Sequence, residues 1–267
     1  MENSANESFG LLEKFIKHDN IEGKVFSFDD PEQGKSTRLR INKVNRVLGS
    51  GDYSKWVAEV NVGLENDAGS EKKTHTMVIK RYQDEGVDAT KDFIKSYKNY
   101  KAIYKAGIPT WDTYRINEEN KLALMTLGAK EGQILITAND YRDRPEMEMF
   151  KLNPVKQIQN LDEFIARISM IFKKASLHGF RLRTDMYGLV FKPQGNKAGV
   201  YELDVLISDL DGLDVSTDPY YIAHYGDKIK ETWEKENKDN LGNALWCIFP
   251  GTADQKREFE ESIMRRL

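Results

Sequence analysis

Leu206-Ile207-Ser208-Asp209-Leu210-Asp211-Gly212 ends an apolar stretch with two carboxylates and a glycine. The turn-forming segment Pro193-Gln194-Gly195-Asn196 separates the apolar residues over 201–208 from those over 189–192, so we expect these two stretches to pair as a β-hairpin. The second strand of this hairpin would lead directly into Asp209. A functional role for Asp209 and an ordinary role as a turn or N-cap residue are both open on this pattern alone.

Strand patterns dominate the first half of the chain. Alternating or β-branched apolar residues predict strands over residues 39–48, 55–64, 74–82, 111–115 and 121–127. A helix ending at Gly107 is expected over residues 88–106, because aromatic residues recur there at three- and four-residue spacing. These aromatic residues are Phe93, Tyr97, Tyr100 and Tyr104.

Helix patterns dominate the second half. Further helices are expected over residues 161–177, 220–236, 240–249 and 253–267. A β-rich half followed by a helical half predicts an α+β fold with two lobes, joined near residues 128–132. The expected division is an N-terminal extension over residues 1–35, a first lobe over 36–128 and a second lobe over 129–267. In the extension we expect a helix over 9–17 and then turns as far as Gly34.

The composition is that of an ordinary globular protein, with 39% hydrophobic and 31% charged residues among 267. The net charge of −3 gives no reason to expect nucleic acid as a partner, because phosphate-binding surfaces usually show a basic excess. One cysteine and four histidines argue against a disulfide framework and a Cys- or His-based metal site. We expect no membrane span and no cleaved signal peptide. The expected location is the cytoplasm, or a host cytosol if the protein is delivered there.

A glycine-rich turn, Gly49-Ser50-Gly51, lies between two strand patterns. Because glycine has no Cβ, the backbone N–H groups of such a turn can approach phosphates closely. Lys80 ends the next apolar stretch, Met77-Val78-Ile79, and a lysine that follows a glycine hairpin is a candidate phosphate ligand. The simpler interpretations are a plain hairpin and a charge at a strand edge.

In this order the segments resemble the protein-kinase-like superfamily over roughly residues 41–249. Ala106-Gly107-Ile108-Pro109 resembles the turn that leaves the kinase αC helix, and the segment over 122–128 is similar to the strand that enters the hinge. Leu177-His178-Gly179-Phe180 is similar to the end of the αE helix, just before the catalytic loop. The resemblance implies a bilobal protein-kinase-like fold, with a β-rich N-lobe, one αC helix and a reduced helical C-lobe.

Two later segments continue this resemblance. Residues 208–212 stand where kinases have Asp-Phe-Gly, in the Asp-x-Asp form of the lipopolysaccharide- and aminoglycoside-kinase-like branches. The segment over 239–247 resembles the start of the αF helix, where an aspartate (here Asp239) opens an apolar helix.

The resemblance implies an enzyme that uses ATP and Mg²⁺ to phosphorylate a hydroxyl group of a protein or of a small molecule. Asp185 is the only carboxylate where the catalytic loop should lie and would orient that hydroxyl, while Lys80 would hold the α/β-phosphates. Asp209 would bind Mg²⁺, and Asp211 is the candidate for a second metal ligand. The nucleotide would be bound by Gly49, Ser50, Gly51, Lys80, Met125 and Leu127.

Several positions depart from the family pattern. Gly188 stands where the catalytic-loop asparagine is expected, and residues 95–99 contain no acid to pair with the strand lysine, Asp92 being the nearest. No Ala-Pro-Glu segment follows Gly212, which argues against a conventional regulated Ser/Thr kinase. A pseudokinase, meaning an interaction module that transfers nothing, is therefore an alternative, and AMP transfer and glutamylation are two more.

Two other motifs carry less weight. Gly34-Lys35-Ser36-Thr37 contains the end of a Walker A loop, but Asp29 stands where that motif needs a glycine, so we treat the match as chance. The Asp209-Leu210-Asp211-Gly212 segment also looks like the first motif of haloacid-dehalogenase-type phosphatases, with Asp209 as nucleophile. Too few residues follow it for the rest of that domain, so this alternative requires a permuted chain.

Overall fold

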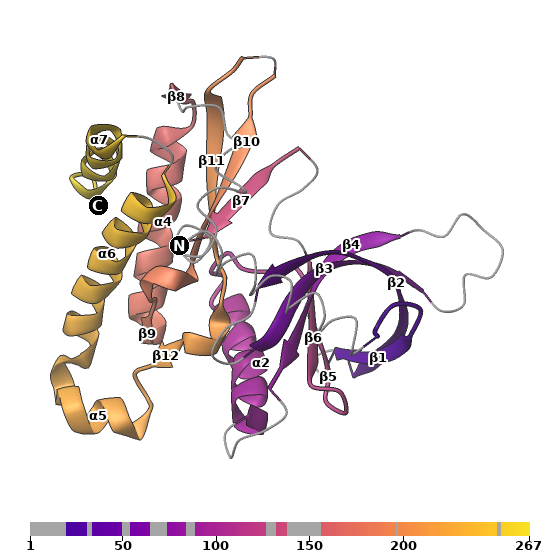
Figure 1. Ribbon diagram of the computed structural model, residues 1–267. Helices are drawn as coiled ribbons and strands as arrows, with labels where there is room; N and C mark the ends of the chain where they lie inside the picture. The colour runs from indigo at the N-terminus through magenta and orange to yellow at the C-terminus, as the bar shows by residue number, and fades with distance from the viewer. Residues whose placement is uncertain are drawn as a thin grey trace, which may run out of the picture. The chain divides into compact units, whose positions relative to one another are not determined.

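The computed structural model describes residues 20–30, 34–49, 54–64, 74–83, 89–126, 132–137, 156–195, 197–249 and 252–267 (Figure 1). The predicted helix over residues 9–17 lies outside these ranges. The chain divides into two compact units, and each is described by itself. The first comprises residues 1–97 and 111–127, and the second comprises residues 98–110 and 128–267.

Antiparallel strands of the first unit close into a barrel in the order β1-β2-β3-β4-β6-β5. The strands are β1 (Val25–Asp30), β2 (Lys35–Gly49), β3 (Ser54–Leu64), β4 (His75–Tyr82), β5 (Tyr114–Asn117) and β6 (Leu122–Thr126). In β3, alternate side chains from Trp56 to Val62 are buried in the barrel core, which is the two-residue period of a strand with one buried face. The predicted strands over 39–48, 55–64, 74–82 and 121–127 are confirmed.

Strand β1 replaces the turns that the sequence predicted before Gly34. Phe26 and Phe28 are buried and β1 pairs with β2 along its whole length, from Val25 opposite Arg40 to Asp30 opposite Lys35. The Phe-x-Phe alternation is short and runs into polar turn-forming residues, which obscured it in the sequence. Because Lys35, Ser36 and Thr37 are ladder residues of β2, they form no phosphate-binding loop.

Helix α2 (Ala89–Lys105) confirms the predicted helix, and Gly107 follows it with a positive φ of 65°. Phe93, Tyr97 and Tyr100 are buried as expected. Tyr104 is exposed, and Ile103 takes the buried position instead, so the predicted aromatic stripe is one residue wrong at its end.

The second unit is built on a sheet with the strand order β7-β10-β11-β8. These strands are β7 (Ile134–Thr137), β10 (Tyr187–Pro193), β11 (Val200–Ile207) and β8 (Gln157–Ile158), and a separate short pair joins β9 (Phe180–Arg181) to β12 (Asp214–Val215). Strands β10 and β11 pair antiparallel from Tyr187 opposite Ile207 to Pro193 opposite Tyr201, which confirms the predicted hairpin.

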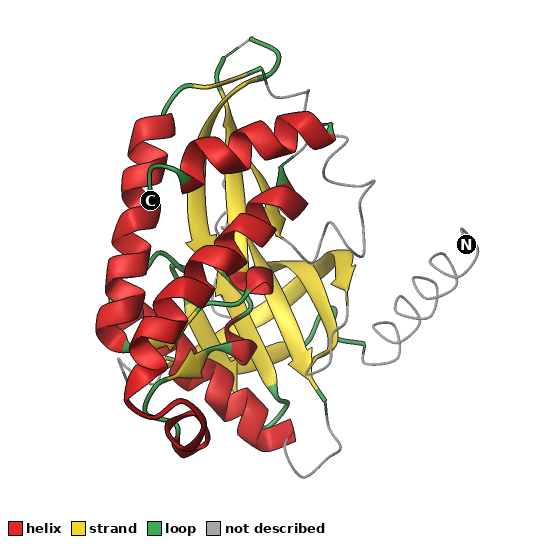
Figure 2. Ribbon diagram, turned by 90° about the vertical axis from the view of Figure 1, so that its left-hand side faces the viewer, coloured by secondary structure: helices red, strands yellow, loops and turns green. Residues whose placement is uncertain are grey.

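The helices of this unit are α4 (Leu161–His178), α5 (Pro219–Tyr225), α6 (Ile229–Ile248) and α7 (Ala253–Met264). Helix α4 packs against β11, and α6 packs against α4, α7 and β10. Figure 2 shows red helices crossing in front of some of the yellow strands. The predicted apolar face of α4 is confirmed, because Phe164, Ile165, Ile168, Ile171 and Phe172 are all buried. No helix in the described ranges is long and apolar enough to cross a membrane.

The predicted break between helices at residues 237–239 is wrong. Helix α6 runs continuously through this polar stretch, and the chain breaks earlier, at Gly226, whose φ of 54° ends α5. Asp239 therefore lies inside α6 instead of opening a helix. The polar stretch is tolerated because both polar atoms of the buried Asn237 side chain form a hydrogen bond to the backbone at Phe180 and Leu182.

Candidate functional site

Two loops of the second unit lie side by side where β10 begins and β11 ends. The Ser208 N–H donates to the carbonyl oxygen of Met186 at 2.7 Å, and the Ser208 hydroxyl lies 3.3 Å from the same oxygen. Met186 follows Asp185 and Ser208 precedes Asp209, so this contact brings together two predicted residues from separate motifs. Asp211 lies in the short turn that follows Asp209.

Asp185 lies in a short 3₁₀ turn, η2 (Thr184–Met186). Its Oδ1 atom is buried and has no hydrogen-bond partner among the described residues. Its Oδ2 atom forms a long ion pair with Nη2 of Arg183, at 3.5 Å. A buried acceptor left in this state costs about 1–3 kcal/mol, so Asp185 has an unmet capacity to accept a hydrogen bond or a proton.

Asp209 adopts the left-handed conformation, with φ 44° and ψ 57°. This conformation is uncommon for residues other than glycine, although aspartate tolerates it better than most. Asp209 is half-buried, whereas Asp211, in the turn η3 (Leu210–Gly212), is only 6% exposed. The side-chain amide of Asn99 donates to the Leu210 carbonyl at 2.7 Å and supports the turn.

Gly212 and Gly188 each leave room that another side chain occupies. A Cβ atom at Gly212 would lie 1.5 Å from Nη2 of Arg183, so the guanidinium group packs directly on the Gly212 backbone. A Cβ atom at Gly188 would lie 2.9 Å from a methyl group of Leu135. The position where the family pattern has an asparagine thus offers no ligand atom and faces an apolar side chain.

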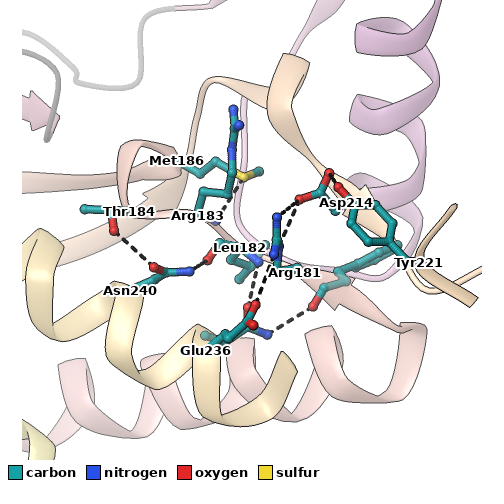
Figure 3. Close-up of polar contacts among 11 residues, drawn as sticks. Arg181, Leu182, Arg183, Thr184, Met186, Asp214, Tyr221, Glu236 and Asn240 are labelled. Atoms are coloured by element: carbon teal, nitrogen blue, oxygen red, sulfur yellow. Dashed lines mark hydrogen bonds and ion pairs between the residues drawn. The ribbon is translucent and has the colours of Figure 1, made fainter. Parts of the chain in front are cut away.

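Two asparagines of α6, Asn237 and Asn240, form hydrogen bonds to the backbone that leads to Asp185, and we call this pair the clamp. Asn237 accepts the Leu182 N–H at 2.7 Å and donates to the Phe180 carbonyl at 3.0 Å. Asn240 donates to the Leu182 carbonyl at 3.0 Å and accepts from the Thr184 hydroxyl at 3.2 Å (Figure 3). Neither asparagine was predicted as a site residue from the sequence.

A charged cluster lies beside this clamp (Figure 3). Arg181 forms ion pairs with Asp214, at 2.7 Å, and with Glu236, at 3.2 Å, and its guanidinium group lies over the rings of Tyr221 and Trp233. Burial works against the charged form of Arg181, but the two carboxylates raise its pKa overall. Burial and the 2.6 Å hydrogen bond to Asp214 raise the pKa of Tyr221 to about 12.

The candidates of the first unit lie on its barrel strands. Lys80 stands opposite Val57 of β3 and Ala123 of β6, and its Nζ atom lies 5.1 Å from the centre of the Tyr82 ring. Met125 is buried in β6, and Gly49 is the last residue of β2. Ser50, Gly51 and Leu127 lie outside the described residues.

Residues 95–99 of α2, where kinases have a glutamate that pairs with the strand lysine, place the hydroxyl of Ser96 against the strands. Ser96 is buried and lies 2.8 Å from the hydroxyl oxygens of both Tyr82 and Tyr114, which are themselves 3.0 Å apart. The side chain of Asp92, the nearest acid in the sequence, lies outside the described part of the helix.

No family model and no curated protein sequence matches the chain. Among solved structures, it is similar to the ROP18 kinase domain in complex with AMP-PNP and sucrose, with a TM-score of 0.50 and 11% identity, over 98% of this chain and 83% of that chain. It is also similar to ROP2 from Toxoplasma gondii, described as a virulence factor with a protein-kinase fold and no enzymatic activity, with a TM-score of 0.47, 7% identity and coverages of 98% and 84%. A third similar structure is the Rio2 kinase ADP/Mg²⁺-phosphoaspartate complex from Chaetomium thermophilum. It has a TM-score of 0.44 and 12% identity, over 84% of this chain and 71% of that chain.

The chain thus has a protein-kinase-like fold, which confirms the resemblance that the sequence suggested. It is a mixed fold with a β-rich part and several helices. The phosphatase alternative loses its basis, because the Asp209 segment follows a hairpin strand of a kinase-like fold. At these low identities the likeness concerns the fold alone.

Proposed function

We propose that this chain is an ATP-dependent phosphotransferase of the bilobal kinase type. In this proposal the first unit is the β-rich N-lobe, the second is the reduced helical C-lobe, and α2 is the αC helix. The fold likeness to the ROP18 kinase domain, whose structure contains AMP-PNP, supports the proposal at the level of the fold. The carboxylates on two adjoining loops support it at the level of the site.

The observation that carries the proposal is the buried, unpartnered Oδ1 of Asp185 beside the turn that holds Asp209. A carboxylate oxygen in this state is suited to orient a hydroxyl group and to take its proton. As that proton moves to Asp185, the acceptor oxygen bonds to the γ-phosphorus of ATP, and the bond from the γ-phosphorus to ADP breaks. The acceptor is a hydroxyl group of a protein or of a small molecule.

The nucleotide is held by residues of the strand-rich unit. Lys80 holds the α/β-phosphates, and its position on a strand paired on both sides fixes the direction in which its side chain leaves the backbone. The backbone of the Gly49-Ser50-Gly51 turn covers the phosphates. The backbone of Met125 and Leu127 binds adenine.

Asp209 and Asp211 suit a magnesium ion that arrives with ATP. In nucleotide sites Mg²⁺ usually takes only one or two carboxylates, and phosphates and water complete its shell. The half-buried Asp209 is the first ligand and the more buried Asp211 the second. A magnesium ion bound there neutralises charge on the phosphates.

Turnover of γ-labelled ATP by the full chain tests this assignment. Asp185→Asn keeps the shape of the side chain but cannot take a proton, so turnover should fall by about a hundredfold or more while nucleotide binding persists. Lys80→Ala and Asp209→Ala should weaken nucleotide binding itself. The control is Asp162→Asn, because Asp162 is 87% exposed on α4 and its ion-pair partner among the described residues is Arg266, so the substitution should change neither quantity. Undiminished turnover in Asp185→Asn would contradict the proposal.

One observation favours a second candidate, a catalytically inactive interaction module. Gly188 supplies no metal ligand, and Leu135 lies against it. If the chain is an inactive module, the wild type itself shows no turnover of γ-labelled ATP with any acceptor, and Asp185→Asn changes nothing. AMP transfer would be recognised separately, because an acceptor would then retain label from α-labelled ATP.

A further inference from the structure

Arg183 is a cation that contacts both loops, through Asp185 on one and Gly212 on the other. Its Nη2 atom is 3.5 Å from Oδ2 of Asp185, and the same guanidinium group packs on Gly212, the residue after Asp211. The side chain is 37% exposed, so the group is neither sealed in the core nor free on the surface. It was not among the residues singled out in the sequence.

The guanidinium group of Arg183 is only weakly engaged. Its Nε atom is buried and has no hydrogen-bond partner among the described residues, and its ion pair with Asp185 is long, at 3.5 Å. Arg181, two residues earlier, shows the opposite state, with its guanidinium group bonded to both Asp214 and Glu236. A guanidinium group matches the geometry of phosphate oxygens and keeps its charge at any physiological pH.

A cation at the two loops would offset the negative charge of their carboxylates and of a bound triphosphate. Asp185, Asp209 and Asp211 bring negative charge to the place where a triphosphate would add more. Protein kinases commonly balance this charge with two magnesium ions, one of which is held by a catalytic-loop asparagine. Here that position is Gly188, which has no side chain and lies against Leu135.

We propose that Arg183 contacts the γ-phosphate and supplies the positive charge that a second magnesium ion would otherwise bring, so that the site works with one metal ion. This inference rests on the proposed phosphotransferase function. Because Arg183 adjoins Asp185, the residue that orients the acceptor hydroxyl, its contact is with the terminal phosphate and not with the α- or β-phosphate.

The test compares the binding of AMP-PNP and of ADP by titration calorimetry in the presence of Mg²⁺. Arg183→Gln should weaken AMP-PNP binding by about tenfold or more, the worth of a charge-assisted hydrogen bond, and should leave ADP binding within about twofold of wild type. Arg183→Lys keeps the charge and should fall between the two. The matched control is Arg167→Gln, because Arg167 forms an ion pair with Asp204 away from the two loops and should affect neither nucleotide.

A second readout needs no variant. Mn²⁺ is added to the wild-type chain with AMP-PNP, and electron paramagnetic resonance measures how many ions are bound. We expect one bound ion per chain. Two bound ions, or equal weakening of AMP-PNP and ADP, or no weakening of either in Arg183→Gln, would overturn the role of Arg183 while leaving the nucleotide site intact. If the wild-type chain bound neither nucleotide, the proposed function would fail and this inference with it.

Discussion

The side-chain oxygen of Asn237 accepts the backbone N–H of Leu182 at 2.7 Å, although the two residues lie 55 positions apart in the chain. The amide nitrogen of Asn237 donates to the Phe180 carbonyl, so one side chain of α6 satisfies backbone groups on both sides of Arg181. This contact fixes the start of the loop that carries Asp185, and the first prediction below tests it.

Replacement of Asn237 by alanine should destabilise the protein by about 2–4 kcal/mol, because it leaves a buried N–H and a buried C=O without partners. Asn237→Asp can still accept from Leu182, but it turns an oxygen toward the Phe180 carbonyl and places a carboxylate in a buried site, so its cost should be at least as large. Urea unfolding of the two variants measures the difference. An alanine variant as stable as wild type would show that the clamp contributes nothing to the fold.

Replacement of Gly212 by alanine should displace Arg183, because the new Cβ atom would overlap its guanidinium group. We expect a loss of stability of about 1–3 kcal/mol, as for other overpacked sites. Arg183→Ala should remove the clash, so the double variant should be more stable than the sum of the single effects predicts. A double-mutant cycle in urea gives this coupling energy, and strict additivity would mean that the two groups do not meet.

The hydroxyl of Tyr221 should titrate late. Its pKa is raised from 10.0 to about 12 by burial and by the hydrogen bond to Asp214. The folded state thus holds this proton more tightly than the unfolded chain. The resulting stabilisation is complete below about pH 10 and is lost as the pH rises through about 12. Asp214→Asn removes the carboxylate and should lower the pKa of Tyr221 toward its ordinary value.

Ultraviolet difference titration follows tyrosine ionisation directly, and Tyr221→Phe identifies the contribution of this residue. Tyr187 must be separated from it, because complete burial also raises the pKa of Tyr187. A Tyr221 signal that does not move in Asp214→Asn would mean that the 2.6 Å hydrogen bond has no influence on the titration.

The parts of the fold that the sequence predicted well are those with a local and regular signal. The apolar face of α4 repeats over its whole length, and the β10–β11 hairpin has apolar stretches on both sides of a turn-forming segment. In each case the pattern lies within one continuous segment. Periodicity and turn chemistry are therefore sufficient to identify these elements.

The missed elements depend on contacts between distant segments. Asn237 stands on the buried stripe of α6, four residues from both Trp233 and Leu241. A polar residue on an apolar stripe was the available signal. The nearby sequence does not indicate that Asn237 binds the backbone groups of Phe180 and Leu182, because these lie in a distant segment. For the same reason the sequence favoured a break at residues 237–239 where the helix continues.

The candidate site shows the same division. Asp185 and Asp209 were selected by their place in the order of the motifs, and their loops do meet through Ser208 and Met186. The packing of Arg183 on Gly212 could not be read from the sequence, because it depends on how two turns from different segments lie against each other. The catalytic and binding roles of these residues stay predictions.

The proposed function requires that this chain bind ATP together with magnesium through Asp209. Thermal unfolding of the wild type and of Asp209→Ala, each with ATP and Mg²⁺, with ATP and EDTA, and without nucleotide, tests it most directly. At a hundredfold excess over the dissociation constant, binding should stabilise the wild type by about 2.7 kcal/mol, which corresponds to a rise of a few degrees. We predict that this rise requires Mg²⁺ and is lost in Asp209→Ala. A wild-type chain whose unfolding temperature is the same in all three conditions would contradict the claim.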